Sequence, residues 1–310
     1  MSFFVPMKIS SKNKQYLSLI IKILIVVAAF YFIYAQLSKS AALNWDQLGN
    51  SNASVSMLIF IVYLSLQNRF LEILKWQNLI SSFQKISIFE STKQVLASLT
   101  LGMVTPNGIG EYAGKALYYK KDKTKNVLFL NVICNGIQLL LSVFFGLIGL
   151  LYLGYSKWVF IVLGIVLVLF LFSFILKKIA IKGYSLTTFV EKINEIPKAI
   201  HQKNMFFGLL RYLTFSHQYY FLFLIFDVQL PYLTLMAAIS AVYFVSSSLP
   251  AFQFLDFAVK GSVAVFFMGK LGVNDWIVVL VAAIMWFLNV VLPVCIGIFY
   301  VLKYKIIERQ

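Results

Sequence analysis

Long apolar runs constrain this chain more than any other feature. A helix of roughly 20 apolar residues is long enough to cross a bilayer. Six runs of this length cover 16–37, 55–74, 127–153, 158–176, 206–226 and 276–302. Hydrophobic residues make up 61% of the chain and charged residues only 12%, far from the usage of soluble domains. The sequence therefore predicts an all-α polytopic integral membrane protein with about six full transmembrane helices.

The net charge of +16 has a topological explanation. In a soluble protein it would raise nucleic-acid binding, but here the lysines gather at the ends of apolar runs. They precede the first run, separate the second from the third, fill a central loop and follow the last run. Because cytoplasmic loops carry an excess of Lys and Arg, we expect both termini in the cytoplasm and no nucleic-acid partner. The first run lacks a small-residue cleavage site and predicts an uncleaved anchor.

Two further apolar segments, 94–119 and 232–270, are each interrupted by a proline. The first segment begins and ends beside lysines, so it enters and leaves the membrane from the cytoplasmic side. By the same count, the second enters and leaves from the opposite side. We therefore expect two proline-broken re-entrant hairpins, around Pro106 and Pro250.

Each of these prolines is followed by an acid and a lysine. Glu111 and Lys115 follow the first proline, and Asp256 and Lys260 follow the second. Both pairs have i,i+4 spacing, which places the two side chains on one helical face within pairing distance. This pattern predicts inverted repeats within a single transmembrane domain, with chance similarity as the alternative. The two repeats would cover 54–154 and 204–302.

Two connecting segments have weaker patterns. The stretch 77–89 is amphipathic and is expected to lie as a short helix on the cytoplasmic surface. The central loop, 182–203, is expected to be helical near 188–194.

The first break predicts a polar cavity, because non-helical backbone at membrane depth is tolerated only in protein or beside water. Gly108 and Gly110 let the backbone approach a ligand or a neighbouring helix. A helix that starts there offers free N–H groups to an anion such as a lipid phosphate. Lys115 would then hold phosphate and Glu111 would balance charge. The alternative is a Glu111–Lys115 pair that ends a helix at the membrane surface.

Asp256 and Lys260 lie between apolar stretches, where an ionisable residue is a functional-site hypothesis by default. We expect them to line the same cavity, with Lys260 available for phosphate. A structural pair that locks two helices is the alternative.

Other polar residues are more ambiguous. Arg69 has donors suited to phosphate, or it simply anchors the second run. His217 and Gln218 line a polar path, or the histidine makes an interhelical hydrogen bond. Cys134 and Cys295 match no metal or redox spacing, and no P-loop, zinc or nucleophile-elbow motif occurs. We therefore expect no cofactor and no metal site.

The segment "TPNGIGEYAGKAL", after "NRFLEILKW", resembles the first signature of the flippase-like membrane region of lysylphosphatidylglycerol synthases. That region also occurs in stand-alone membrane proteins. Specific matches are confined to Arg69, 106–115 and, more weakly, 249–261. The second proline is followed by "PAFQFLDFAVKG", whereas family members often have a glycine-rich stretch there. This sequence also lacks the soluble aminoacyltransferase domain, so we do not expect the synthase reaction.

The resemblance implies a multi-pass protein of the bacterial cytoplasmic membrane that moves a phospholipid or lipid-linked molecule across it. The expected partners are membrane lipids with an anionic or zwitterionic headgroup. Two alternatives stay open: a membrane-embedded enzyme acting on polyprenyl or phospholipid phosphates, and a membrane partner subunit of a lipid or glycan synthesis enzyme. The expected headgroup-binding residues are Arg69, Pro106, Gly108, Gly110, Glu111, Lys115, Pro250, Asp256 and Lys260.

Overall fold

The computed structural model describes residue 27 and residues 54–103, 105, 108–176, 185–249 and 256–303, and the regular elements in these ranges are all helical. Two segments are short: the 3-10 turn η3 (Lys121–Lys123) and the π-helical turn η5 (Phe287–Val291). The α-helices are α2 (Val55–Ile80), α3 (Ile88–Met103), α4 (Ile109–Leu117), α5 (Thr124–Tyr152), α6 (Ser156–Leu176), α7 (Leu186–Glu195), α8 (Lys198–Ile225), α9 (Tyr232–Ser248), α10 (Asp256–Gly269), α11 (Asp275–Trp286) and α12 (Leu292–Lys303). Apart from Val27, the predicted first span lies outside the described residues, as do Pro106 and Pro250.

Within the described residues, four helical segments are long and apolar enough to cross a membrane: Val55–Ile80, Lys121–Tyr152, Ser156–Ser173 and Asp275–Lys303. They coincide with four of the six predicted spans, and the prediction of a helical multi-pass membrane protein is confirmed. The predicted span 206–226 lies within α8, which has 28 residues and is about 42 Å long. Helix α8 is long enough but less apolar, because its first half carries several basic residues.

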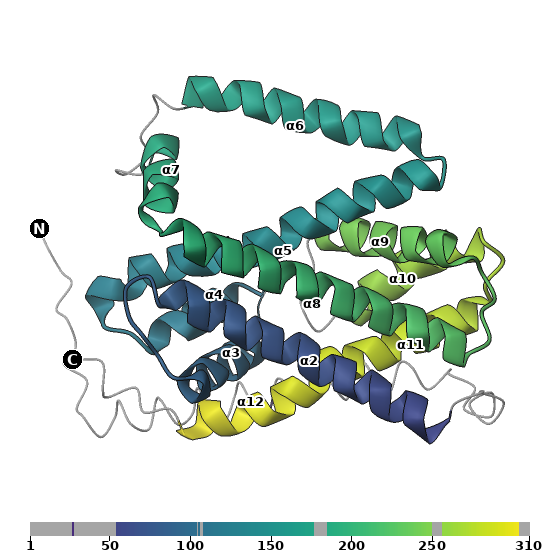
Figure 1. Ribbon diagram of the computed structural model, residues 1–310, viewed down its shortest axis with the longest axis horizontal. Helices are drawn as coiled ribbons and strands as arrows, with labels where there is room; N and C mark the ends of the chain where they lie inside the picture. Colours follow the sequence, from purple (N-terminus) through teal and green to yellow (C-terminus); the bar gives the residue numbers. More distant parts are fainter. Residues whose placement is uncertain are drawn as a thin grey trace, which may run out of the picture.

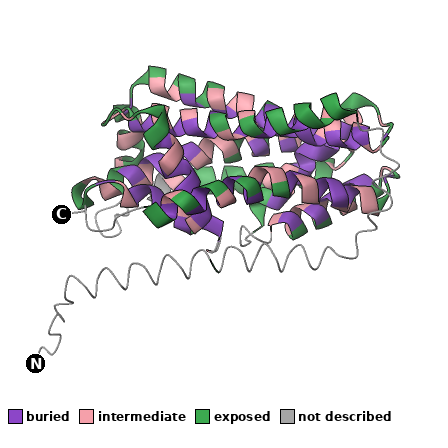
Figure 2. Ribbon diagram, turned by 90° about the horizontal axis from the view of Figure 1, so that it is seen from below, coloured by how far each residue is buried: buried purple, intermediate pink, exposed green. Residues whose placement is uncertain are grey.

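The outer surface is the apolar one. Exposed residues lie along the outer faces of the bundle helices, and buried residues lie on the faces that meet inside (Figure 2). Leu, Ile, Val and Phe side chains dominate the large exposed hydrophobics, whereas Glu72, Lys75 and Lys115 are buried. Helix α6 stands apart from the bundle (Figure 1), and only 6% of its span is buried. This distribution suits a chain surrounded by lipid.

Helices α2 and α8 pack side by side through the middle of the bundle (Figure 1). At one end α3 packs on α4 and α12, and at the other α9 packs on α10 and α5. The helices α2, α3, α4 and α5 can be matched in order with α8, α9, α10 and the α11–α12 segment. The packing of α3 on α4 then corresponds to that of α9 on α10, and the packing of α3 on α12 corresponds to that of α9 on α5. A pseudo-twofold axis between inverted repeats would produce this packing, although the repeat itself remains a prediction.

The first proline-containing segment forms two closely packed helices. A Cβ atom built on Gly110 would collide with the Leu101 carbonyl, and one on Gly114 would lie 2.8 Å from Ser98 Cα. The two glycines, four residues apart, therefore let α4 lie directly on α3, as small residues do in membrane helix pairs. Gly108, with φ of 66°, takes the left-handed conformation that begins α4.

Serine hydroxyls complete the end of α9, before the second break. Ser246 Oγ donates to the Val242 carbonyl at 2.6 Å, and Ser248 Oγ donates to the Phe244 carbonyl at 2.9 Å. Both carbonyls lie inside α9, so each hydroxyl satisfies its own donor on the backbone of the preceding turn. These serines can therefore lie in apolar surroundings without an unpaired hydroxyl donor.

The predicted surface helix 77–89 is wrong. Residues 77–80 complete α2, a turn follows, and α3 begins at Ile88. The reason is a capping box: the Glu90 N–H donates to Ser87 Oγ at 3.1 Å, and the Ser87 N–H donates to Glu90 Oε2 at 3.2 Å. In the central loop the predicted helix is confirmed as α7, although the end of that loop already belongs to α8.

Candidate functional site

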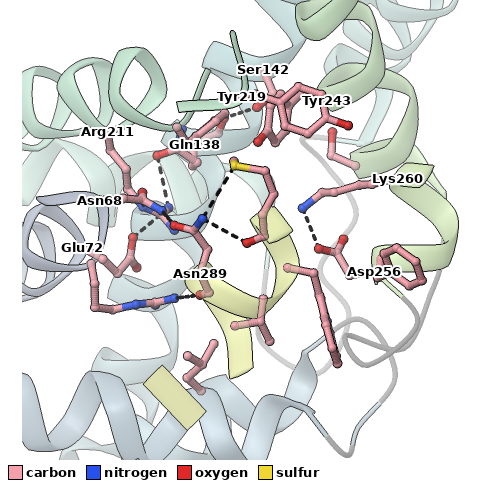
Figure 3. Close-up of a pocket in the computed structure, with 18 of the residues that line it drawn as sticks. Asn68, Glu72, Gln138, Ser142, Arg211, Tyr219, Tyr243, Asp256, Lys260 and Asn289 are labelled. Atoms are coloured by element: carbon pink, nitrogen blue, oxygen red, sulfur yellow. Dashed lines mark hydrogen bonds and ion pairs between the residues drawn. The ribbon is translucent and has the colours of Figure 1, made fainter. Parts of the chain in front are cut away.

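A polar cavity of about 390 Å³ lies inside the bundle. Its lining comes from α2, α3, α4, α5, α8, α9, α10, α11 and η5, and thus from both halves of the chain. Six charged side chains are among the lining residues: Arg69, Glu72, Glu111, Arg211, Asp256 and Lys260. The close-up in Figure 3 shows Glu72 and Arg211 grouped on one side, with Asp256 and Lys260 on the other. Acidic and basic groups are equal in number, so the lining is formally neutral.

On the side of the cavity that contains Glu72 and Arg211, an ion pair joins α2 to α8. Arg211 Nη1 lies 2.8 Å from Glu72 Oε2, and only 4% of the Glu72 side chain is exposed. Arg211 Nε also donates to Asn68 Oδ1 at 3.0 Å, and its Nη1 donates to Gln138 Oε1 at 3.3 Å. Because Gln138 belongs to α5, the arginine joins three helices around the cavity. Glu72 also has Lys75 at 3.6 Å behind it.

Asn289 lies in the π-helical turn η5 and connects the cavity wall to α2. Pro293 has no N–H, so the Asn289 carbonyl lacks its usual i+4 donor. The backbone widens here, as the Leu292 N–H donates to the Phe287 carbonyl five residues back. Arg69 Nη2 donates to the free Asn289 carbonyl at 2.5 Å, and Asn68 Nδ2 donates to Asn289 Oδ1 at 2.6 Å. Because of the proline, the Asn289 carbonyl is available to accept a hydrogen bond from Arg69.

Glu111 and Lys115 form the pair that their spacing predicts, with Nζ 2.9 Å from Oε1. Glu111 lines the cavity. Lys115 is fully buried, and its ammonium also donates to Asn131 Oδ1 at 2.8 Å and lies 4.8 Å from the centre of the Trp76 ring. In this arrangement Lys115 orients Glu111 from behind instead of reaching into the cavity, in contrast to its predicted phosphate contact.

The start of α4 is also less open than expected. The Gly110 N–H donates to Thr105 Oγ1 at 2.7 Å, and the Glu111 N–H donates to the Gly108 carbonyl at 2.8 Å. These two amides are therefore occupied within the protein. Gly108 and Gly110 serve the turn and the packing of α4 on α3, which is the second of the two roles considered for them.

Asp256 and Lys260 form the most accessible pair of the cavity. Lys260 Nζ lies 2.6 Å from Asp256 Oδ2, and the two side chains are 34% and 29% exposed, respectively. The ammonium lies 5.5 Å from the centre of the Tyr243 ring. Both residues line the cavity, as expected from their spacing.

Several hydrogen-bonding atoms of the lining have no partner in the described structure. They are Arg69 Nε, Gln138 Nε2, Trp286 Nε1 and the Tyr219 hydroxyl. All four can donate, and a buried donor without a partner is costly. The cavity is therefore suited to a ligand rich in acceptor oxygens.

His217 and Gln218 face different surroundings. His217 is half-buried, and its ring nitrogens hydrogen-bond to the Leu213 carbonyl at 2.8 Å and to the Tyr232 hydroxyl at 2.9 Å. Gln218 is buried, donates to the Ile61 carbonyl at 3.0 Å and accepts from Asn289 Nδ2 at 3.0 Å. The histidine thus matches the interhelical alternative, whereas the glutamine supports the cavity wall.

Asn68, Gln138 and Asn289 were not identified as site residues from the sequence. They are single amides on three different elements, and only their positions in the fold bring them together. The Asn289–Pro293 spacing was the one usable signal, since a proline four residues later frees a carbonyl. Among the described residues, no group of three or more His, Cys, Asp or Glu side chains could hold a metal ion.

Comparison with known families gives one match. The family described as the lysylphosphatidylglycerol synthase TM region matches residues 19–253, about three quarters of the chain. The matched range includes Arg69 and Glu111 and ends just before Asp256 and Lys260. No curated protein and no solved structure gave a match. The chain therefore belongs to the lysylphosphatidylglycerol synthase TM region family.

Proposed function

We propose that this protein is a lipid translocase that moves a phospholipid or lipid-linked molecule across the membrane, with the headgroup passing through the central cavity. The observation that carries this proposal is the placement of six charged side chains around an internal cavity inside an apolar exterior. Charged residues within membrane segments are costly and mark transport paths or ligand sites. A lipid headgroup is polar and needs such a lined path to cross the apolar interior of the bilayer.

The lining suits a phosphate-containing headgroup. Arg69, Arg211 and Lys260 provide positive charge, and the unpartnered donors provide further hydrogen bonds. A volume of about 390 Å³ falls in the range of small-molecule sites, roughly 300–1,000 Å³. The three carboxylates balance the basic groups or contact a headgroup amine, so both anionic and zwitterionic headgroups are compatible with the lining.

The position of the cavity also supports transport. It lies where the α3–α4 and α9–α10 pairs approach the central α2 and α8 helices. In transporters with inverted repeats, broken helices meet at a site between the repeats, which then rock against each other. The exchangeable packing of the two halves supports the same arrangement here, with the two pairs as re-entrant hairpins.

The test is headgroup sidedness in reconstituted liposomes, with fluorescent phospholipids and a membrane-impermeant quencher. We expect the native protein to accelerate flipping, and Glu111→Gln or Lys260→Gln to slow it by roughly tenfold or more. This magnitude follows from losing a charge-assisted hydrogen bond of about 1.5–3 kcal/mol. Glu195→Gln and Lys270→Gln are matched controls, because both side chains are exposed and lie outside the cavity lining.

Three outcomes separate the functions considered. Flipping that only the cavity variants reduce, with lipid mass unchanged, supports the translocase. A change in lipid mass would instead support the alternative function, an enzyme acting on lipid phosphates. If no lipid class moves or changes, and the cavity variants retain the biological activity of the native protein, a partner subunit is the better description.

A further inference from the structure

A second hollow of about 370 Å³ lies between the end of α2, the α2–α3 connection and the start of α8. It shares no lining residue with the central cavity. Its polar lining consists of Gln77, Asn78, Ser81, Lys85 and Lys203. We propose that this groove binds the phosphate of a phospholipid in the adjoining leaflet, at a site separate from the translocation cavity.

Interhelical hydrogen bonds hold the walls of the groove in place. Asn78 Nδ2 donates to the Ile200 carbonyl at 2.8 Å and so joins α2 to α8. Gln77 Nε2 donates to the Ile86 carbonyl at 3.0 Å and joins α2 to the connection that carries Lys85. The two lysines, which are 118 positions apart in the sequence, thus reach one groove through a fixed frame.

The charge of the groove is uncompensated. Within the described part of the chain, neither Lys85 nor Lys203 takes part in an ion pair, and no acidic residue lines the groove. This differs from the central cavity, where each basic group has an acid nearby. Two free ammonium groups favour an anion that contributes charge of its own.

The remaining lining identifies the anion as part of a lipid. Leu74, Ile86 and Phe207 provide an apolar wall next to the lysines. A phosphate bound to the lysines would let an acyl chain follow this wall towards the exposed Phe206 on the outer face of α8. A free phosphate in water would not use such a wall.

The groove also adjoins the lysine cluster that precedes α5. Lys123 Nζ donates to Gln84 Oε1 at 3.2 Å, so the lysine cluster before α5 adjoins the α2–α3 connection. This is the lysine-rich side that the sequence predicts to be cytoplasmic, where anionic lipids attract basic residues. The lipid would bind to the bundle at the boundary between α2 and α8.

Native mass spectrometry of the full-length protein in detergent tests the site, with dioleoyl phosphatidylglycerol as the probe. We expect the Lys85→Gln/Lys203→Gln variant to lose one lipid adduct, because its affinity for the phospholipid at that site should fall roughly 30-fold. This factor combines the contributions of two lysines next to an anionic lipid, converted at about tenfold per 1.4 kcal/mol. Lys120→Gln/Lys121→Gln is the matched control, since it removes two exposed lysines on the same side and leaves the groove intact. Dioleoylglycerol and glycerol 3-phosphate separate the contributions of chains and phosphate.

The proposal is overturned if both double variants lose lipid equally, which would indicate general attraction by surface charge. It is also overturned if glycerol 3-phosphate competes as strongly as the phospholipid, which would indicate a water-soluble ligand. Lys260→Gln keeps this test apart from that of the translocase: the groove adduct should persist in this variant even if the central cavity binds no lipid. Unchanged thermal unfolding of the variants confirms that they are folded.

Discussion

The buried pair of Glu111 and Lys115 gives the sharpest stability prediction. In Lys115→Met the carboxylate of Glu111 loses its partner at 2.9 Å, and Asn131 Oδ1 loses its donor at 2.8 Å. Removing one member of a buried pair costs about 3–5 kcal/mol. Because 17% of the Glu111 side chain is exposed, part of its charge is hydrated, and we expect a loss near the lower limit, about 3 kcal/mol.

Thermal unfolding in detergent measures this loss. At about 2 °C per kcal/mol for a chain of this size, Lys115→Met should lower Tm by roughly 6 °C. Lys260→Met is the comparison, because its pair is about one third exposed and should cost roughly 1 kcal/mol or less. Glu111→Gln combined with Lys115→Met should recover part of the loss, since no unpaired carboxylate remains. Equal losses for the two lysine variants would refute the argument from burial.

Three further predictions address the frame of the site. Gly114→Val should destabilise the protein by about 1–3 kcal/mol, because its Cβ would lie 2.8 Å from Ser98 Cα; Gly136→Val, whose Cβ meets nothing within 4 Å, should have little effect in the same unfolding assay. Pro293→Ala restores an amide that can donate to the Asn289 carbonyl. The substitution should raise Tm, because a helix-interior proline costs about 3 kcal/mol relative to alanine, and it should slow lipid flipping, because Arg69 loses its acceptor. Unchanged flipping would contradict this role of the π-helical turn. Ser87→Ala removes the capping box of α3 and should cost about 1 kcal/mol, whereas Ser82→Ala, outside that box, should leave Tm within 1 °C of the native value, at about 2 °C per kcal/mol.

Local sequence patterns predicted the helical elements well. Apolar runs gave the positions of α2, α5, α6 and the α11–α12 segment, because a span needs a continuous apolar stretch. The i,i+4 spacing gave the two acid–lysine pairs, because helix geometry alone brings such residues together. The predicted surface helix at 77–89 is wrong because the capping box of Ser87 and Glu90 starts α3 within that stretch.

The composition of the site depends on packing between distant helices, which spacing along the chain does not reveal. Asn68 and Asn289 are separated by 221 positions and meet only because α2 crosses η5. Arg211 meets Glu72 for a similar reason, through the contact of α2 with α8. A polar residue within an apolar run predicts a buried partner, but it does not say which helix supplies that partner.

Arg211 and Lys260 differ in how readily they could bind phosphate in the cavity. Arg211 is held by Glu72, Asn68 and Gln138, so a ligand would have to break a three-helix connection to reach it. Among the described residues, Lys260 has a single ion-pair partner, Asp256, and its side chain is about one third exposed.

Because Asp256 and Lys260 are both partly hydrated, a phosphate can replace the carboxylate at the ammonium at little cost. The released Asp256 is then free to meet a headgroup amine. We therefore expect headgroup exchange to begin at the α10 side of the cavity. Arg211 would maintain the helix arrangement while Lys260 binds and releases the ligand.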